Sequence, residues 1–396
     1  MANQRPAVRF LQVLLALFAA ASAPAWSQSE SEPDLRQQQL IEDPVNRMLG
    51  EQNYYDMWLF LSRSRTDWIR TSAAIFLYRG FGVDPGPDPE LRGMGERLMT
   101  EILASKPREP HALWLLLKFC TADPGFPGCA SNDFQQRVIE SDPDNAAVYL
   151  VPVTLWDFSN LPVLADNEEN RRALLRASHA HRFDDYYGRD LLQVYRELSV
   201  FAERYPVNHE PAMDQSASAR AGSYAWTVMM MEPQLAFGAL YDLCEAQAVA
   251  ERMDTADACL SVARTMQKTA RTLLVRTLGY GLERRVSYAL DGDEATALYL
   301  RRKARMSTEA TVCQLPSWMT GAVTEPEIEE SAVLEYLADL DAEGEIAAIR
   351  NAGAREFEAH PERFEQDPAR CGELMDLDSE AMGAALGELD PALQQQ

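Results

Sequence analysis

The sequence lacks the short motifs that mark several common catalytic chemistries. No G-x-S-x-G occurs, so the signature of a hydrolase serine is missing, and without a Gly-Lys pair there is no Walker phosphate-binding loop. His209-Glu210 has no second histidine with which to complete the H-E-x-x-H of a zinc protease. Glu330-Ser331 resembles the pair of lytic transglycosylases, but the glycine-rich segment expected after it is absent. We therefore predict no catalytic residues and no cofactor.

Positive charge is also scarce. The chain has 37 lysines and arginines against 61 aspartates and glutamates, a formal net charge of -24. Such an acidic chain repels the phosphates of nucleic acids and of anionic membranes, and it favours solubility. We expect no nucleic-acid partner.

Alternating apolar and polar residues, the pattern of a β-strand, are nearly absent. Apolar residues instead recur every three or four positions, which predicts an all-α chain. One long apolar segment, YAWTVMMMEPQLAFGALYDLC, is interrupted by Glu232 and Pro233, so we expect a buried core helix with a break rather than a membrane span.

The longest uninterrupted apolar run lies at the N-terminus. Arg5 and Arg9 come before FLQVLLALFAAASAPA, which closes on a small-x-small site at Ala23 to Ala25. This pattern predicts a signal peptide over residues 1–25, with cleavage after Ala25. The run is short for a membrane span, so we expect a periplasmic or secreted protein with no stable membrane insertion.

Six cysteines in an exported chain favour disulfides over free thiols, although six cysteines allow 15 connectivities and small buried cysteines are the alternative. One pair brackets a loop rich in proline and glycine, and a second pair lies level on the two arms of a helical hairpin that turns near Arg252. The remaining two cysteines are left to each other. The expected pairs are Cys120 with Cys129, Cys244 with Cys259, and Cys313 with Cys371.

Two segments, KPREPHALWLLLKFC and DPDNAAVYLVPVTLW, share a pattern in which a helix ends at proline and a strongly apolar helix follows. Pro107 and Pro143 lie 36 residues apart. Over roughly residues 88–160 the chain resembles the tetratricopeptide (TPR) superfamily, with Pro143 similar to its terminal proline and Tyr149 to the aromatic residue of the next helix. The resemblance implies a TPR-like α-solenoid of stacked antiparallel helix pairs, here stapled by disulfides, and solenoids commonly serve as binding surfaces.

These patterns divide the chain into five parts: a signal peptide (1–25), a polar lead-in (26–52), a helical-repeat domain (53–310), an acidic helical segment packed on the repeats (311–375) and an acidic flexible tail (376–396). Helices are expected over residues 90–105, 345–359 and 184–205, the last capped by Asp184. Asp67 is expected to cap a helix over residues 68–78.

A block of basic residues is the best candidate for a binding site. Ten basic residues face four acids between Arg264 and Arg305, whereas residues 325–345 hold nine acids and no base. Residues i, i+4 and i+7 share a helix face, so a basic ridge is expected; its residues are Arg264, Lys268, Arg271, Arg301, Arg302 and Arg305. It could bind an acidic peptide, a phosphate or a glycan; alternatively, its charges pair with the acidic helix across a solvated face.

The segment SHAHRFDD is the best candidate for a metal site, through His179, His181, Asp184 and Asp185. Histidines two apart point to opposite sides of a helix, so they could share a metal only on a loop. The alternative is a polar turn between helices in which Asp184 caps the next helix. We favour the turn and predict no metal.

The sequence thus predicts a non-catalytic helical-repeat protein of the bacterial envelope whose partner is a protein or peptide. Two alternatives remain open. One is an all-helical enzyme acting on envelope polymers or lipids, and the other is a small-anion binder at the basic ridge between residues 264 and 305.

Overall fold

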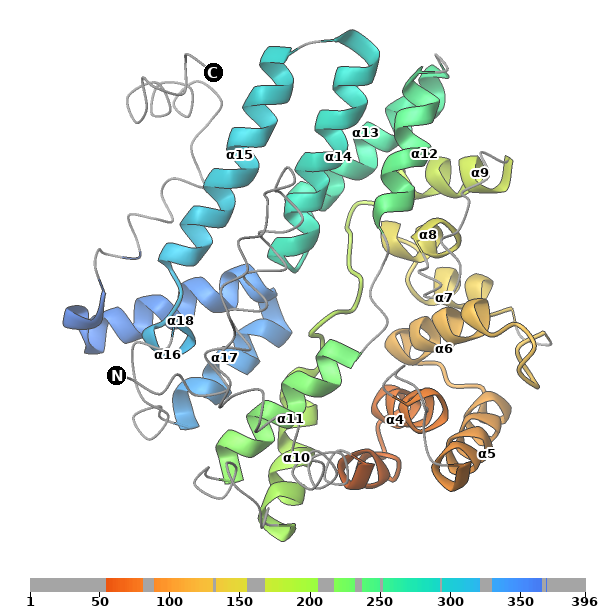
Figure 1. Ribbon diagram of the computed structural model, residues 1–396, viewed down its shortest axis with the longest axis vertical. Helices are drawn as coiled ribbons and strands as arrows, with labels where there is room; N and C mark the ends of the chain where they lie inside the picture. Colours follow the sequence, from red (N-terminus) through yellow and green to blue (C-terminus); the bar gives the residue numbers. More distant parts are fainter. Residues whose placement is uncertain are drawn as a thin grey trace, which may run out of the picture.

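The computed structural model describes residues 55–80, 89–130, 133–154, 168–205, 217–231, 237–249, 252–292, 294–320, 330–364 and 368. These residues are 80% helical and include no strand, which confirms the all-α prediction (Figure 1). The predictions for the signal peptide, the polar lead-in and the acidic tail lie outside the described residues. No helix in the described ranges is long and apolar enough to cross a membrane.

The helices follow one another with short connections. After a helical stretch at residues 55–61 come α4 (Asp67–Arg79), α5 (Pro89–Ser105), α6 (Pro110–Ala122), α7 (Phe134–Ser141), α8 (Ala146–Thr154) and α9 (Glu168–Ala177). They are followed by α10 (Leu191–Arg204), α11 (Ala217–Met231), α12 (Phe237–Val249), α13 (Met253–Thr269), α14 (Leu273–Asp291) and α15 (Glu294–Cys313). The last are α16 (Ser317–Thr320), α17 (Glu330–Glu343), α18 (Glu345–Ala359) and the 3-10 turn η3 (Pro361–Arg363).

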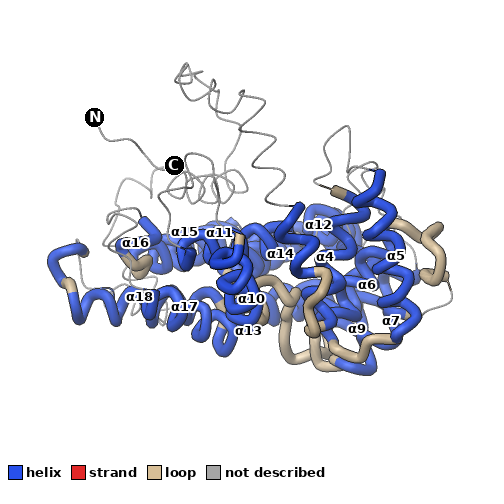
Figure 2. The backbone as a smooth tube through the Cα atoms, turned by 90° about the horizontal axis from the view of Figure 1, so that it is seen from below, coloured by secondary structure: helices blue, strands red, loops and turns tan. Residues whose placement is uncertain are grey.

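Most helices pack against their neighbours in sequence. The main pairs are α4 with α5, α8 with α9, α10 with α11, α13 with α14, α14 with α15, and α17 with α18. In Figure 2 the helices form a flat, elongated body in two tiers, with α13, α17 and α18 in one tier and α11, α14 and α15 in the other. The connection from α9 to α10 crosses the middle of the molecule (Figure 1).

One apolar core runs through these pairs. It begins with stacked aromatic rings, such as those of Trp58 and Phe76, whose centroids lie 4.5 Å apart. It continues to α17, where Leu337 and Leu340 belong to the same cluster of buried side chains. Burial of this apolar surface drives the helices together, since isolated helices of this length are marginal in water.

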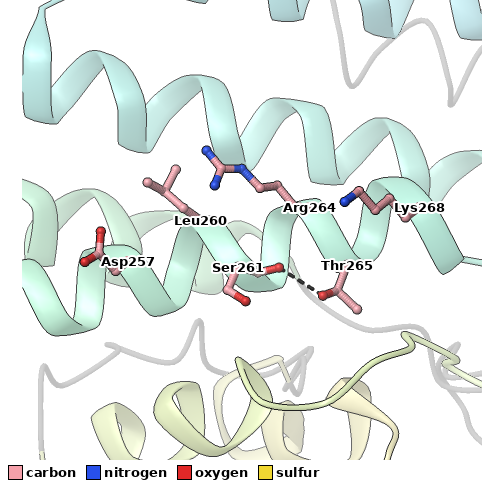
Figure 3. Close-up of a pocket in the computed structure, with 6 residues that line it drawn as sticks. All are labelled: Asp257, Leu260, Ser261, Arg264, Thr265 and Lys268. Atoms are coloured by element: carbon pink, nitrogen blue, oxygen red, sulfur yellow. Dashed lines mark hydrogen bonds between the residues drawn. The ribbon is translucent and has the colours of Figure 1, made fainter.

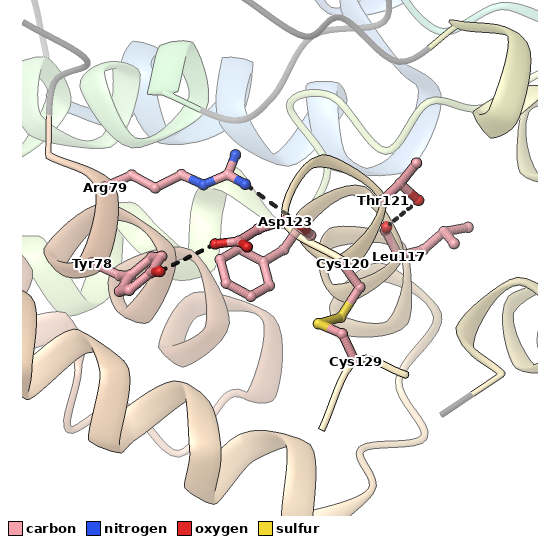
Figure 4. Close-up of a disulfide and its surroundings, with 8 residues drawn as sticks. Tyr78, Arg79, Leu117, Cys120, Thr121, Asp123 and Cys129 are labelled. Atoms are coloured by element: carbon pink, nitrogen blue, oxygen red, sulfur yellow. Dashed lines mark hydrogen bonds between the residues drawn. A yellow bond between two sulfur atoms is a disulfide. The ribbon is translucent and has the colours of Figure 1, made fainter. Parts of the chain in front are cut away.

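Two of the three predicted disulfides are confirmed. Cys120 bonds to Cys129 and closes the loop after α6, and Cys244 bonds to Cys259 across the hairpin of α12 and α13. Around the first disulfide, Tyr78 donates a hydrogen bond to Asp123 at 3.1 Å (Figure 4). Each crosslink closes a short loop, worth about 3 kcal/mol by the chain-entropy estimate. The third predicted pair includes Cys371, which lies outside the described residues.

Two predicted helix caps are wrong, although α4, α5 and α18 begin within one residue of the prediction. The N-cap of α4 is Thr66 rather than Asp67, which is the first residue of the helix and carries its charge near the positive end of the helix dipole. The helix expected from Asp184 begins only at Leu191, and its N-cap is Asp190. Asp184 is instead occupied by partners far away in the sequence, as described below.

Candidate functional site

A groove lies along one side of α13, with a cavity volume of about 360 Å³. Its lining residues are Asp257, Leu260, Ser261, Arg264, Thr265 and Lys268. Counted from Asp257, they are spaced 3, 4, 7, 8 and 11 positions along the helix and therefore share one face. Figure 3 shows them in a row, with Asp257 at one end and Lys268 at the other.

The opposite face of α13 fixes this orientation. Its buried side chains include Ala256, Cys259, Val262, Ala263 and Met266, and the helix packs against α9, α12 and α14. Small residues let α14 approach closely: an alanine Cβ at Gly279 would lie 2.8 Å from the Ala263 carbonyl oxygen. The disulfide from Cys259 to Cys244 adds a covalent link to α12. The polar face is left to line the groove.

The chain that follows α9 lies against α13 beside the groove. The Ser261 hydroxyl donates to the Ser178 carbonyl at 2.9 Å, and the backbone N–H of Phe183 donates to the Thr269 hydroxyl at 2.9 Å. These two bonds hold residues 178–183 beside the helix. Ser261, a lining residue of the groove, is thereby joined to a segment more than 80 residues away in the sequence.

The basic end of the groove holds Arg264 and Lys268. The Arg264 Nε donates to Glu283 of α14 at 2.8 Å, and Gln267 donates to the other carboxylate oxygen of Glu283 at 2.6 Å. Arg264 is nevertheless 56% exposed, so its remaining N–H groups face the groove and solvent. Neither Lys268 nor Asp257 forms an ion pair within the described ranges. The groove therefore has a positive end and a negative end.

The predicted basic ridge is divided among three places. Arg264 and Lys268 line the groove together. Arg271 lies beyond the end of α13 and donates to the carbonyl oxygens of Leu340 and Asp341, at 2.6 and 2.8 Å, so it joins α17 to the rest of the fold. The other three residues, Arg301, Arg302 and Arg305, belong to α15, which packs on α14.

Within the described residues, α17 forms no ion pair with Arg264 or Lys268. On α17, Glu335 and Asp339 form ion pairs with Arg355 of α18 at 2.9 and 2.8 Å. Arg264 pairs with Glu283 instead, a residue of the basic block itself. Among the residues that the structure describes, the basic block (264–305) and the acidic block (325–345) thus form these ion pairs separately.

A polar clamp that the sequence analysis missed holds the segment after α9 in place beside the groove. It consists of Asp142, Asn145, Arg182, Asp184 and Tyr186. The fully buried Asn145 side chain donates to the Asp184 carbonyl at 2.8 Å and accepts from the Asp184 N–H at 2.9 Å. Arg182 pairs with both Asp142 and Asp184, and the Tyr186 hydroxyl donates to Asp142. The only sequence signal was the turn SDPDN, whose partners lie about 40 residues away.

The clamp also determines the structure of SHAHRFDD, the segment that was the best candidate for a metal site. Asp184 accepts hydrogen bonds from Arg182 and Arg189 at 3.2 and 3.3 Å, which leaves it no role as a helix cap. His181 is exposed, and its backbone N–H, not its ring, contacts Asp144. In the described part of the chain, no group of three or more histidine, cysteine, aspartate or glutamate residues is placed to hold a metal ion.

Asp185, next to the clamp, gives the fold a pH dependence. Removal of its carboxyl from water and the neighbouring Asp184 carboxylate together raise the pKa of Asp185 to about 6, against the attraction of the buried Lys118 ammonium. A raised carboxyl pKa means that the folded state favours the protonated form. The stability this provides is complete below the ordinary pKa near 3.8 and is lost as the pH rises through about 6.

Replacing Asp185 with asparagine, which mimics the protonated carboxyl, should stabilise the protein at pH 7.5 by about 1–2 kcal/mol and leave it nearly unchanged at pH 4. Thermal unfolding across this pH range measures the effect. Asp144→Asn, an exposed change in a nearby turn, is the control and should follow the wild-type curve. Parallel curves for wild type and Asp185→Asn would mean that Asp185 does not titrate in this range.

The groove residues offer contacts for binding a ligand. Its two hydroxyls already donate to backbone carbonyls, Ser261 to Ser178 and Thr265 to Ser261, so neither is activated by a base. What remains for a ligand is a pair of cations, a carboxylate and the apolar surface of Leu260. Comparisons of this chain with protein-family models, with curated proteins and with solved structures find no match.

Proposed function

We propose that this chain is an exported, TPR-like helical-repeat protein that binds a protein or peptide partner in the bacterial envelope through the α13 groove. The observation that carries the proposal is the groove itself, an open polar surface with Lys268 at one end and Asp257 at the other, neither of which forms an ion pair in the described ranges. Uncompensated charges along a shaped surface give specificity for a ligand of complementary charge.

The architecture supports a binding role. Helices pack mainly on their sequence neighbours, as expected when repeated helix pairs stack in a row. Pro143, the residue most similar to the TPR terminal proline, lies in the turn between α7 and α8. Stacked helix pairs present long surfaces, which suit a peptide or a protein better than a small substrate.

Export is supported by the covalent structure. Two disulfides lie within the described residues, and such bonds persist mainly in oxidising compartments. The N-terminal apolar run that follows two arginines supports the same location, because it has the form of a signal peptide. A partner in the periplasm or outside the cell follows from this proposal.

Crosslinked capture from the exported fraction of native cells tests the function. The decisive variant exchanges the end charges of the groove, Asp257→Lys with Lys268→Asp, and so keeps the net charge and both exposed positions. Arg301→Glu, an exposed change on α15, is the control. We expect a partner captured by wild type and by Arg301→Glu to be lost at least tenfold from the exchanged variant. Equal capture by all three proteins would place the interaction elsewhere.

A further inference from the structure

The two ends of the α13 groove differ in charge, and this difference specifies a ligand. At the basic end, Arg264 and Lys268 are one helical turn apart, close enough for both to contact one carboxylate. Glu283 is 12% exposed and already accepts from Arg264 and Gln267, so it orients the guanidinium and leaves the Lys268 ammonium uncompensated. An acidic group is the complementary partner for this end.

The middle of the groove suits a peptide backbone and a small apolar side chain. Leu260 is partly buried and contributes apolar surface. The hydroxyl protons of Ser261 and Thr265 are committed to backbone carbonyls, so their oxygens remain as acceptors for a ligand N–H. The volume of about 360 Å³ lies at the lower end of the range for ligand pockets, which fits a few side chains and no folded domain.

The acidic end sets the length of the ligand. Asp257 is exposed, and it lies 7 and 11 positions from Arg264 and Lys268 on the same face. At a rise of about 1.5 Å per residue these separations are roughly 10 and 16 Å. An extended peptide covers that span in about three to five residues.

We propose that the groove binds an extended peptide segment carrying an acidic and a basic side chain about four positions apart, the acidic one at Arg264 and Lys268 and the basic one at Asp257. This inference rests on the proposed function and names the chemistry of the partner. A free inorganic anion would need the basic end alone, so the role of Asp257 separates the two ligands.

Short peptides test the charge pattern on the full-length protein. The probes are acetyl-KALAE-amide, its two single-charge relatives QALAE and KALAQ, the doubly acidic EALAE, and inorganic phosphate, each titrated calorimetrically at low salt. We expect KALAE to bind three- to tenfold more tightly than either single-charge peptide, and its affinity to fall with added salt. EALAE should bind wild type more weakly than KALAE does.

A charge reversal in the protein makes the test independent of folding defects. In Asp257→Lys the ranking should invert, with EALAE binding more tightly than KALAE, because the ligand must now present an acid at both ends. Arg301→Glu should keep the wild-type ranking. An inverted preference cannot arise from a damaged fold, since damage weakens all peptides alike.

Three results would overturn the inference. They are equal binding of KALAE and QALAE, an unchanged ranking in Asp257→Lys, and no peptide binding up to millimolar concentrations. Phosphate binding as tight as KALAE would assign the basic end to a small anion. If the native partner is nevertheless lost from the charge-exchanged variant, the proposed function stands and only this ligand chemistry fails. A partner retained by that variant overturns the proposed function of the groove and places the interaction elsewhere.

Discussion

Replacing Gly95 of α5 with alanine is expected to destabilise the protein by about 3 kcal/mol or more, whereas the same replacement at Gly93 is expected to stabilise it slightly. An alanine Cβ at position 95 would lie 2.4 Å from the backbone nitrogen of Tyr78 and 2.8 Å from the carbonyl carbon of Leu77. Both atoms belong to the backbone of α4 and cannot rotate away. Helices α4 and α5 would have to separate, which would open the core between them.

Gly93 lies two residues before Gly95, on nearly the opposite side of the same helix, and provides the matched control. Its added Cβ would find its nearest neighbour, the flexible end of Arg97, at 3.6 Å. Alanine at that position restricts the unfolded chain without a clash, a gain of about 0.5–1 kcal/mol. Urea unfolding followed by circular dichroism measures both variants. Midpoints shifted in the same direction would contradict the close approach of α4 and α5.

Asn145→Ala is expected to cost about 3–5 kcal/mol, because it removes four hydrogen bonds at once from a fully buried position. The Asn145 amide donates to Asp142 and to the Asp184 carbonyl, and it accepts from the N–H groups of Ala147 and Asp184. Alanine would leave several of these buried groups without partners, each at about 1–3 kcal/mol. Thermal and urea unfolding measure the loss.

Asp144→Ala, the adjacent exposed position, is the control for this prediction. Within the described part of the chain its side chain accepts one long hydrogen bond, from the His181 N–H at 3.4 Å, so its removal should cost about 0.5 kcal/mol or less. Equal losses for the two variants would show that the turn, and not the clamp, carries the stability. Because the clamp holds the segment that is hydrogen-bonded to Ser261 of the groove, Asn145→Ala should also weaken KALAE binding at temperatures where the variant remains folded.

The charge pattern of the basic block shows where sequence reasoning about a site fails. The i, i+4 spacing of Arg264 and Lys268 places both on one face, and the structure brings them together in the groove. Arg271 has the right spacing, but α13 ends at Thr269, so the helical face does not extend to it. Its carbonyl partners, Leu340 and Asp341, are about 70 residues away and leave no local trace in the sequence.

The sequence by itself determined the features that depend on residues close to one another along the chain. Apolar periodicity fixed the all-α class and the helices α5 and α18, and loop and hairpin geometry fixed the pairs Cys120–Cys129 and Cys244–Cys259. Each of these follows from helix geometry or from the short reach of a local loop.

Only the tertiary structure decided the start of α10, the polar clamp and the groove. The sequence predicts Asp184 as the cap of this helix, yet Asp184 is held by Asn145 from 39 residues away and α10 begins at Leu191. Likewise, the chain after α9 lies beside the groove because Ser261 of α13 donates to Ser178, far away in the sequence. Hydrogen bonds to buried partners outweigh a local capping preference of about 1 kcal/mol, and long-range packing chooses those partners.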